Sequence, residues 1–430
     1  MVKSLSKPDV KSLYSELCAD MQPYIMFRIA QRVADLTEEL TAKGRKPIKM
    51  SIGAPTILPP QALRDKVKNL MNEDGLNTYS SPRGEVFFRD GVAKRMLSRF
   101  GVLVEPGKEV CSLIGSKEGL AAMFRALITP KDKTIEKDII LIPDPGYASY
   151  VDAIKIAGGL PYAVPLTPEN QFMPDLNRIH QALSNSGYNS NNIKAVVINY
   201  PNNPTGATAT MDYYKQVVEF ARQHNILIIS DIAYADMVFE GQEKPHSILE
   251  VEGAKDIAIE FHSLSKPYAV TGWRLGFAVG NEDAISVLAT VKSTMDSGIW
   301  KVLQKAGAFA LNSPDCADFI AKMNRVYQEN QQFMVEGFKQ LGWPAKALNV
   351  PKATFYFWIP VPPRYSSCTD FANDMLEKSG IVVVPGTAFG GNGEGYVRLS
   401  LVNPREELNE VLERMKADGF VYDLNPAEDA

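Results

Sequence analysis

The chain has 430 residues, a formal net charge of −4, and a composition that is 45% hydrophobic and 22% charged. These values are typical of a globular protein with one large or two ordinary domains. The small negative charge gives no reason to expect nucleic acid or an anionic membrane surface as a partner, and no apolar run is long enough to span a bilayer. The four cysteines and four histidines are scattered, which predicts free thiols in the cytoplasm and no histidine-based metal site.

The N-terminal part contains one predicted helix, at residues 27–44, followed by the stretch "MSIGAPTILPP". The segment before this helix mixes charged residues throughout and has no apolar core, so we do not expect a signal peptide. We expect residues 1–60 to form an arm that packs on a partner, together with part of a smaller domain.

Short apolar runs alternate with helix-like segments between about residues 105 and 280. The helix-like segments, such as 211–225, carry apolar residues at helical spacing. This alternation predicts a mostly parallel sheet with helices on both faces, in a domain that we assign to residues 61–305. The predicted strands are β-branched and bounded by polar or turn residues, and they lie at 110–114, 138–142, 195–199, 226–230 and 257–261.

The last part of the chain has a different pattern. Residues 353–361, 380–386 and 396–402 look like strands of a second, smaller sheet, with a helical segment at 368–380. We therefore expect residues 306–430 to form a small C-terminal α+β domain.

Each predicted strand of the larger sheet is followed by a polar or glycine-rich stretch. These stretches are, in chain order, "GSKEG", "PDPGY", "YPNNPTG", Asp231 with Tyr234, and "HSLSK". Ligands of open α/β sheets bind beyond the carboxyl ends of the strands. Five such matches predict a ligand site at this edge of the sheet.

Lys266, in "HSLSK", is a candidate covalent nucleophile. A lysine at the mouth of a parallel sheet can form a Schiff base with a carbonyl cofactor. A pyridoxal cofactor also needs an acid for its ring nitrogen, which Asp231 supplies, and a site for its phosphate. The helix start in "GSKEG" and the guanidinium of Arg274 suit a phosphate. Taken alone, Asp231 is equally typical of a helix N-cap, and "GSKEG" of a structural helix start.

Three further residues have both a functional and an ordinary interpretation. Asn203 can bind the cofactor ring or simply belong to the "NPTG" turn. Tyr147 can stack on the ring or be a half-buried aromatic residue. Arg398, inside the apolar "YVRLSLV", can clamp a substrate carboxylate or form a structural salt bridge.

The combination of motifs resembles the class I/II pyridoxal-phosphate-dependent aminotransferases of fold type I, over about residues 25–415. The resemblance rests on "YPNNPTG", "SDIAY", "HSLSKPYAVTGWRLG" and "YVRLSL", in the order and spacing of that family. It implies an α/β fold whose large domain has a mostly parallel seven-stranded sheet flanked by helices, plus a smaller α+β domain. It also implies a transaminase that exchanges an amino group between an L-amino acid and a 2-oxo acid, such as 2-oxoglutarate or pyruvate, in a ping-pong reaction.

The resemblance assigns roles to the matching residues. Lys266 matches the lysine that binds pyridoxal 5'-phosphate and moves the substrate proton, Asp231 matches the partner of the ring nitrogen, and Tyr234 with Asn203 matches the contacts of the ring hydroxylate. The remaining cofactor positions are Tyr147 on the ring and Ser116, Lys117, Ser263 and Arg274 at the phosphate.

Three other positions concern the substrate and the assembly. Gly53 and Arg398, together with Asn203, match the substrate-binding positions, with Arg398 on the α-carboxylate. Tyr79 matches the tyrosine that reaches the phosphate of the neighbouring subunit, which implies a homodimer with its active sites at the interface.

Within the family, "IEFHSLSK", "TGWRLGFAVG" and "ATFYFWIPVP" look most like LL-diaminopimelate aminotransferases, so LL-2,6-diaminopimelate is the predicted amino donor. Alanine- and aspartate-type aminotransferases are the alternative, because "YSSPRG" and "IGSKEGLA" are equally like the alanine type. A β-lyase on the same scaffold would keep the same lysine and aspartate. Two residues depart from the pattern: Pro267 stands where relatives have Ser or Thr, and Arg83 stands where some diaminopimelate-type relatives have an acidic residue.

Overall fold

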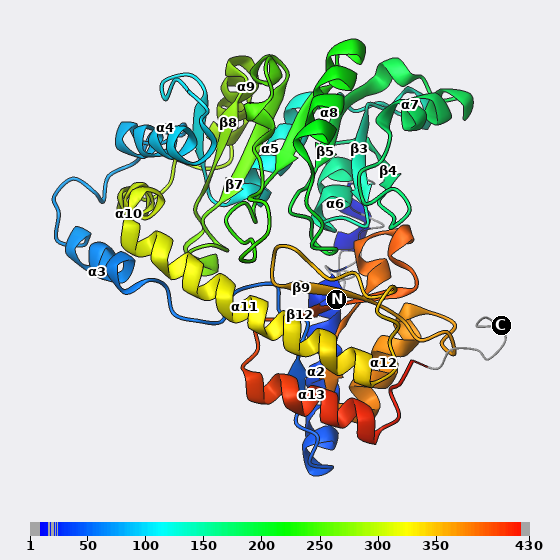
Figure 1. Cartoon of the computed structure of the whole chain (residues 1–430). Coiled ribbons are helices and arrows are strands. Elements are labelled where there is room, and N and C mark those ends of the chain that lie inside the picture. The colour runs from blue at the N-terminus through cyan, green and yellow to red at the C-terminus, as the bar shows by residue number, and fades with distance from the viewer. Residues whose placement is uncertain (1–8, 16–17, 19–20, 22, 24, 423–430) are drawn as a thin grey trace, which may run out of the picture.

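The structure is a computed structural model that describes residues 9–15, 18, 21, 23 and 25–422 (Figure 1). Its centre is a seven-stranded sheet with the strand order β2-β8-β7-β6-β5-β3-β4. All neighbouring pairs are parallel except those of β8, which runs antiparallel to both β2 and β7. The strands are β2 (Val110–Leu113), β3 (Ile139–Asp144), β4 (Leu160–Pro165), β5 (Ile193–Ile198), β6 (Leu227–Asp231), β7 (Ala258–Ser263) and β8 (Gly276–Gly280).

The five strands predicted from the apolar pattern are all present, as β2, β3, β5, β6 and β7. The pattern did not single out β4 and β8. Strand β4 contains two prolines and lies at the edge of the sheet, where a missing N–H is tolerated. Strand β8 has a glycine at each end and only three residues between them.

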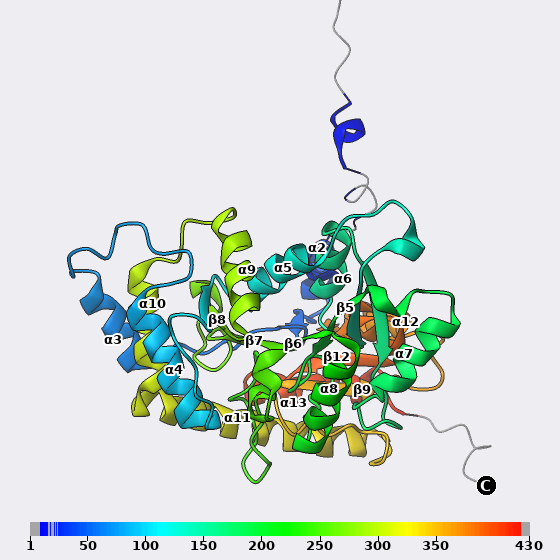
Figure 2. The same ribbon diagram turned by 90° about the horizontal axis from the view of Figure 1, so that it is seen from above.

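Helices cover both faces of this sheet (Figures 1 and 2). One hydrophobic core packs α5, α6 and α9 against one face, and a larger core packs α3, α4, α7, α8 and α10 against the other. The bounds are α3 (Gln61–Leu70), α4 (Val86–Phe100), α5 (Ser116–Leu127), α6 (Ser149–Ile156), α7 (Leu176–Asn185), α8 (Met211–His224), α9 (Glu282–Ser293) and α10 (Lys301–Asn312).

The smaller part of the molecule holds two short pieces of sheet. Strands β11, β12 and β9 form an antiparallel three-stranded sheet, and β1 pairs in parallel with β10. The expected strand at 380–386 is therefore divided, because the chain changes pairing partner at Val383. The bounds are α2 (Ile25–Ala42), β1 (Ile48–Lys49), α11 (Pro314–Gln340), β9 (Tyr356–Pro360), α12 (Cys368–Ser379), β10 (Ile381–Val382), β11 (Val384–Pro385), β12 (Tyr396–Ser400) and α13 (Arg405–Ala417).

Helix α2 belongs to the smaller part, whereas the long helix α11 joins the two parts. Helix α2 packs Val33 and Leu40 against α12 and β10, so residues from 25 onward contribute to the smaller part. The long helix α11 contributes Ile320 to the core of the large sheet and Met323 to the core of the smaller part. The division into 1–60, 61–305 and 306–430 stays a prediction. Along α11, the side chains pass from the core of the large sheet to the core of the smaller part. Among the described residues, the helices are all too short or too polar to cross a membrane.

Candidate active site

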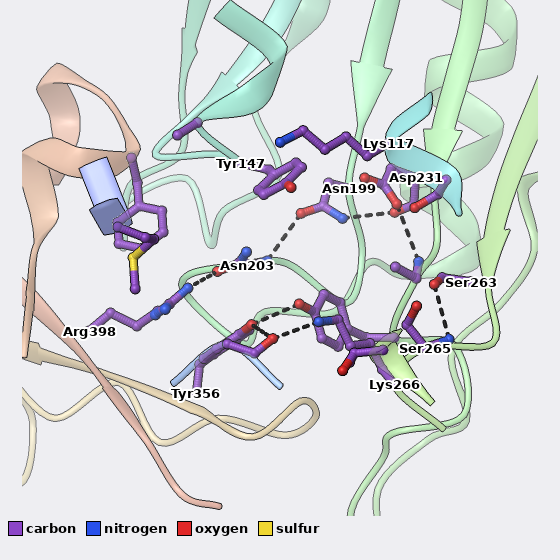
Figure 3. Close-up of a pocket in the computed structure, with 18 of the residues that line it drawn as sticks. Lys117, Tyr147, Asn199, Asn203, Asp231, Ser263, Ser265, Lys266, Tyr356 and Arg398 are labelled. Atoms are coloured by element: carbon purple, nitrogen blue, oxygen red, sulfur yellow. Dashed lines mark hydrogen bonds between the residues drawn. The ribbon is translucent and has the colours of Figure 1, made fainter. Parts of the chain in front are cut away.

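A cavity of about 230 Å³ lies at the carboxyl ends of the parallel strands, between the large sheet and the smaller part of the chain (Figure 3). Strands β6 and β7, the starts of α5 and α6, and β12 all contribute side chains to it. The structure brings together every predicted site residue except Tyr79, namely Gly53, Ser116, Lys117, Tyr147, Asn203, Asp231, Tyr234, Ser263, Lys266, Arg274 and Arg398.

Lys266 lies in the turn that follows β7, and its amine points into the cavity (Figure 3). Its Nζ donates a hydrogen bond to the carbonyl of Gly53 at 2.6 Å. Burial, followed by repulsion from Arg398 and Arg274, lowers the pKa of this amine to about 8, although Asp231 acts in the opposite direction. A lowered pKa leaves more of the amine neutral near pH 7, which is the form that attacks a carbonyl group.

Asp231 is the last residue of β6 and is almost completely buried. One carboxylate oxygen, Oδ2, accepts a hydrogen bond from the Tyr150 hydroxyl at 2.6 Å, and Oδ1 accepts one from the Ala233 amide at 3.3 Å. Burial raises the pKa of Asp231, and these two donors oppose that rise. A turn rather than a helix follows Asp231, so this residue is not a helix N-cap.

Two hydrogen bonds organise the side of the cavity nearest the smaller part of the chain. The hydroxyl oxygens of Tyr234 and Tyr356 lie 2.9 Å apart, and Asn203 Oδ1 accepts a hydrogen bond from Arg398 Nη1 at 2.8 Å. On the opposite side, Lys117 Nζ lies 6.0 Å from the centre of the Tyr147 ring. A flat aromatic ligand between Asp231 and Arg398 would meet these hydroxyl, amide and aromatic groups.

The start of α5 forms an anion cradle with Arg274. Gly115 has φ +98°, and a Cβ atom there would lie only 2.4 Å from Arg274 Nη2, so this close approach requires glycine. Arg274 itself has a left-handed backbone with φ +55°, and its Nη1 donates to the Thr271 carbonyl at 2.9 Å. The Ser265 hydroxyl is buried and lacks a hydrogen-bond partner among the described residues. A helix N-terminus, a guanidinium and serine hydroxyls together suit a phosphate dianion.

Arg398 is buried on β12, and the hydrogen bonds and ring contacts found for it among the described residues are all to uncharged groups. Its Nη2 donates to the Ser51 carbonyl at 3.2 Å, and its guanidinium lies 4.1 Å from the ring centre of Tyr356 and 4.7 Å from that of Phe389. These contacts position the guanidinium without neutralising it. They favour a carboxylate clamp over the alternative of a structural salt bridge.

Three residues singled out in the sequence lie elsewhere. Tyr79 is 86% exposed and lies beside Trp300 in a separate surface hollow, outside the cavity of its own chain. Arg83 Nη1 donates to the Gly107 carbonyl at 2.7 Å and does not line the cavity. Pro267 lines a small separate cavity behind the lysine, together with Tyr268.

The sequence interpretation missed several residues of the site. Tyr150 lies in the first turn of α6, and its ring meets that of Tyr147 edge to face with centres 5.6 Å apart; nothing in the sequence marks it as a partner of Asp231. Asn199 donates to the Asp231 carbonyl at 2.8 Å and accepts from the Asn203 amide at 3.1 Å. Tyr356 stands in a strand full of aromatic residues, where nothing in the sequence distinguishes it.

The chain matches the sequence profile of the family described as aminotransferase class I and II, over residues 45–415. The chain therefore belongs to this family, whose members depend on pyridoxal phosphate, and it is a transaminase. This confirms the predicted family, activity and fold class.

Individual relatives agree with this assignment. The chain is 42% identical to an LL-diaminopimelate aminotransferase 2 of Trichormus variabilis, covering 93% of this chain and 97% of the relative. It is 40% identical to the LL-diaminopimelate aminotransferase of Moorella thermoacetica, covering 92% and 96%. Among solved structures, substrate-bound BacF from Bacillus subtilis aligns with a TM-score of 0.87 and 30% identity, over 96% of this chain and 99% of the other. A double mutant of Thermus thermophilus aspartate aminotransferase aligns with a TM-score of 0.83 and 26% identity, over 94% and 99%.

Proposed function

We propose that this transaminase binds pyridoxal 5'-phosphate in the cavity of Figure 3, with Lys266 as the covalent anchor, and that its amino donor is LL-2,6-diaminopimelate. The observation that carries the cofactor assignment is that one cavity offers three matching groups. These are a lysine with a lowered pKa, a buried carboxylate on β6, and the anion cradle of Arg274 and α5. The buried and unpartnered Ser265 hydroxyl supports this assignment, because a phosphate oxygen would give it a partner.

The residues of the cavity have distinct tasks in this proposal. Arg398 binds the α-carboxylate of the amino acid and fixes its orientation. With the cofactor bound, the neutral amine of Lys266 would be the base that moves the proton of the substrate Cα. Asp231 stabilises a proton on the ring nitrogen, and Tyr150 holds the Asp231 carboxylate in position. The bound cofactor supplies a ring that accepts electron density from the substrate.

The donor assignment rests on the diaminopimelate-type relatives at about 40% identity. LL-2,6-diaminopimelate carries a second ammonium and carboxylate at its far end. The lining of the cavity also includes Ile25, Met26 and Phe389 of the same chain, which are apolar, and Phe389 lies 4.7 Å from the Arg398 guanidinium. The far end of this donor would therefore be bound by polar groups of a second subunit.

The apolar lining also favours a second candidate, an amino donor with an apolar side chain such as phenylalanine or methionine. Such a donor would contact Ile25, Met26 and Phe389 without any help from a partner subunit. Aspartate and alanine remain the alternatives that the motifs leave open.

A panel of amino donors distinguishes these possibilities. Purified protein loaded with pyridoxal 5'-phosphate is assayed with LL-diaminopimelate, phenylalanine, methionine, alanine, aspartate and glutamate, each with 2-oxoglutarate and with pyruvate. The proposal expects the highest kcat/KM for LL-diaminopimelate, and a higher value for any other donor contradicts it. Release of pyruvate and ammonia from a sulfur amino acid without an acceptor would identify a β-lyase. Lys266→Ala protein is the control for background exchange.

We infer a homodimer from the exposed Tyr79, whose role in the neighbouring subunit's site stays a proposal. A cytoplasmic location is likewise a proposal, and cell fractionation tests it.

A further inference from the structure

The glycine-rich loop 390–395 of the smaller part lies against the carboxyl end of β3. Asp144 is the last residue of β3 and is only 6% exposed. Its Oδ1 accepts a hydrogen bond from the Asn392 amide at 3.1 Å, and its Oδ2 accepts one from Asn392 Nδ2 at 2.9 Å. The Gly391 amide also donates to this carboxylate. One carboxylate of the large sheet therefore holds several donors of the loop.

This contact requires a glycine at position 390. The Gly390 backbone has φ +130°, and a Cβ atom on it would overlap the Asp144 carboxylate. Gly395, at the other end of the same loop, also has a left-handed backbone with φ +81°, but its added Cβ would meet no atom within 4 Å. The start of the loop is therefore fitted to Asp144, whereas its end is an open turn.

Phe389 connects this loop to the candidate active site, which it lines. Its carbonyl accepts a hydrogen bond from the Gly146 amide at 2.8 Å, a second link between the loop and the segment that follows β3. Its ring centre lies 4.7 Å from the Arg398 guanidinium, and the ring meets that of Trp358 edge to face with centres 5.9 Å apart. The segment that begins at Asp144 is thus joined to the residue that flanks the proposed carboxylate clamp.

We propose that Asp144 is a positioning residue for the substrate carboxylate: it binds loop 390–393 to the end of β3 and thereby holds Phe389 beside Arg398. This inference rests on the proposed function, in which Arg398 binds that carboxylate. Asp144 does not line the cavity, so it acts through the loop and not by touching the ligand. Its hydrogen bonds cross from the large sheet to the smaller part, so their loss lets the loop and Phe389 move away from Arg398.

Two substitutions break the contact from opposite sides. Asp144→Ala removes the acceptor on β3, and Gly390→Ala places a Cβ atom in the space of the carboxylate. Protein loaded with pyridoxal 5'-phosphate is titrated calorimetrically with 2-oxoglutarate and with pyruvate, which are not converted without an amino donor. The 2-oxo acid that the wild type binds more tightly is the probe. We expect each variant to bind this probe about tenfold more weakly, because a displaced wall of a binding site loses affinity of this order.

The affinity for pyridoxal 5'-phosphate separates this effect from general damage. The anion cradle of Arg274 and α5 belongs to the large sheet and has no part in loop 390–395. We therefore expect both variants to bind the cofactor within about threefold of the wild type. A fall in cofactor affinity as large as the fall in affinity for the 2-oxo acid overturns the inference.

Two control variants keep the contact. Asp144→Asn retains an amide oxygen for the backbone donors, and its amide nitrogen can donate to a turned Asn392 side chain, so we expect affinity for the 2-oxo acid within about threefold of the wild type. Gly395→Ala adds a methyl group to the same loop in open space and reports backbone strain alone. Because Asp144→Ala and Gly390→Ala break one contact, the double variant is expected to bind no more weakly than the weaker single variant.

The outcomes distinguish the inference from the proposed function. Wild-type affinity for the 2-oxo acid in Asp144→Ala, an equal loss in Gly395→Ala or in Asp144→Asn, or losses that add in the double variant each overturn the inference. A wild-type protein that binds no cofactor contradicts the proposed function instead.

A second measurement needs no variant. If the contact between Asp144 and the loop favours binding of the 2-oxo acid, binding must by reciprocity stabilise the contact. Hydrogen exchange with mass spectrometry on the loaded wild-type protein is therefore expected to show slower exchange in the peptides that contain Gly146 and Asn392 when the 2-oxo acid is added. Unchanged exchange in both peptides overturns the inference.

Discussion

At the scale of single residues, the positive charges of the cavity act on one another as well as on a ligand. Burial and the repulsion from Arg398 and Arg274 lower the pKa of Lys266 to about 8. The two guanidiniums thus activate the lysine in addition to the anion-binding tasks that we propose for them. The carboxylate of Asp231 limits the shift, since an opposite charge favours the ammonium form.

The pKa of Lys266 predicts how fast the cofactor-free protein reacts with pyridoxal 5'-phosphate. The amine attacks only when it is neutral, so the rate of covalent binding is expected to rise with pH through a midpoint near 8 and to level off at higher pH. Arg398→Gln removes one source of repulsion, which stabilises the ammonium form and moves the midpoint to higher pH. Stopped-flow absorbance measures both curves. A midpoint above pH 10 in the wild-type protein, or a downward movement in the variant, contradicts this explanation.

Substitution of Gly115 measures how much the anion cradle contributes to cofactor binding. Gly115→Ala introduces a Cβ atom 2.4 Å from Arg274 Nη2 at a backbone φ of +98°. We expect about tenfold or more weaker binding of pyridoxal 5'-phosphate, because displacing the guanidinium loses a charge-assisted hydrogen bond of about 1.5–3 kcal/mol. Equilibrium titration of the cofactor-free protein measures the change.

Gly241→Ala is the control for that experiment. Gly241 also has a left-handed backbone, with φ +82°, but no atom lies within 4 Å of its added Cβ. It therefore reports the strain alone, and its cofactor affinity should equal that of the wild type. If the wild type, Gly115→Ala and Gly241→Ala proteins bind the cofactor equally well, the position of Arg274 does not require a glycine at position 115.

At the scale of elements, most of the large sheet and most of the cavity could be predicted from the sequence. The strands that end in polar residues do meet at one edge, and the helix at 211–225 is present as α8. Strand β8 and the division of 380–386 could not be predicted, because the first depends on pairing with β2 and β7, and the second on a change of partner. Tyr150 and Tyr356 could not be predicted for a related reason. Tyr150 contacts Asp231 and Tyr356 contacts Arg398, and both pairs are far apart in the sequence.

The turn after β7 explains the unusual Pro267. The amides of Ala269 and Val270 donate within this turn, to the carbonyls of Lys266 and Ser265, and Pro267 lines the small cavity behind it rather than the site. Pro267→Thr is therefore expected to change the affinity for pyridoxal 5'-phosphate by less than about threefold, since the restored N–H does not lie in the cradle. A much larger gain in affinity, measured by the same titration, would show that the proline removes a donor that the phosphate uses.

At the scale of the whole molecule, the cavity lies between two hydrophobic cores that share α11. Residues from both sides contribute to it, Lys266 and Asp231 from the large sheet and Arg398 from the smaller one. The surface hollow around Tyr79 and Trp300 lies apart from this cavity. In our proposal it is the part of the chain that completes the site of a second subunit.

A hybrid dimer tests that proposal. Lys266→Ala and Tyr79→Ala proteins, each with little activity alone, are co-expressed with different tags and purified as a mixed dimer. If Tyr79 serves the neighbouring subunit, one site of the hybrid has both Lys266 and Tyr79, and about half of the wild-type activity per dimer returns. If Tyr79 acts within its own chain, the hybrid has no complete site and the activity does not return.

The central claim is that Lys266 is the residue that holds the cofactor covalently. The direct measurement is reduction of the protein with borohydride in the presence of pyridoxal 5'-phosphate, followed by proteolysis and mass spectrometry. We expect a single pyridoxyl-phosphate modification on Lys266, and its disappearance in Lys266→Ala protein that retains the wild-type circular dichroism spectrum. A modification on Lys117 or another lysine with Lys266 unlabelled, or no modification of the wild-type protein, would contradict the proposed function.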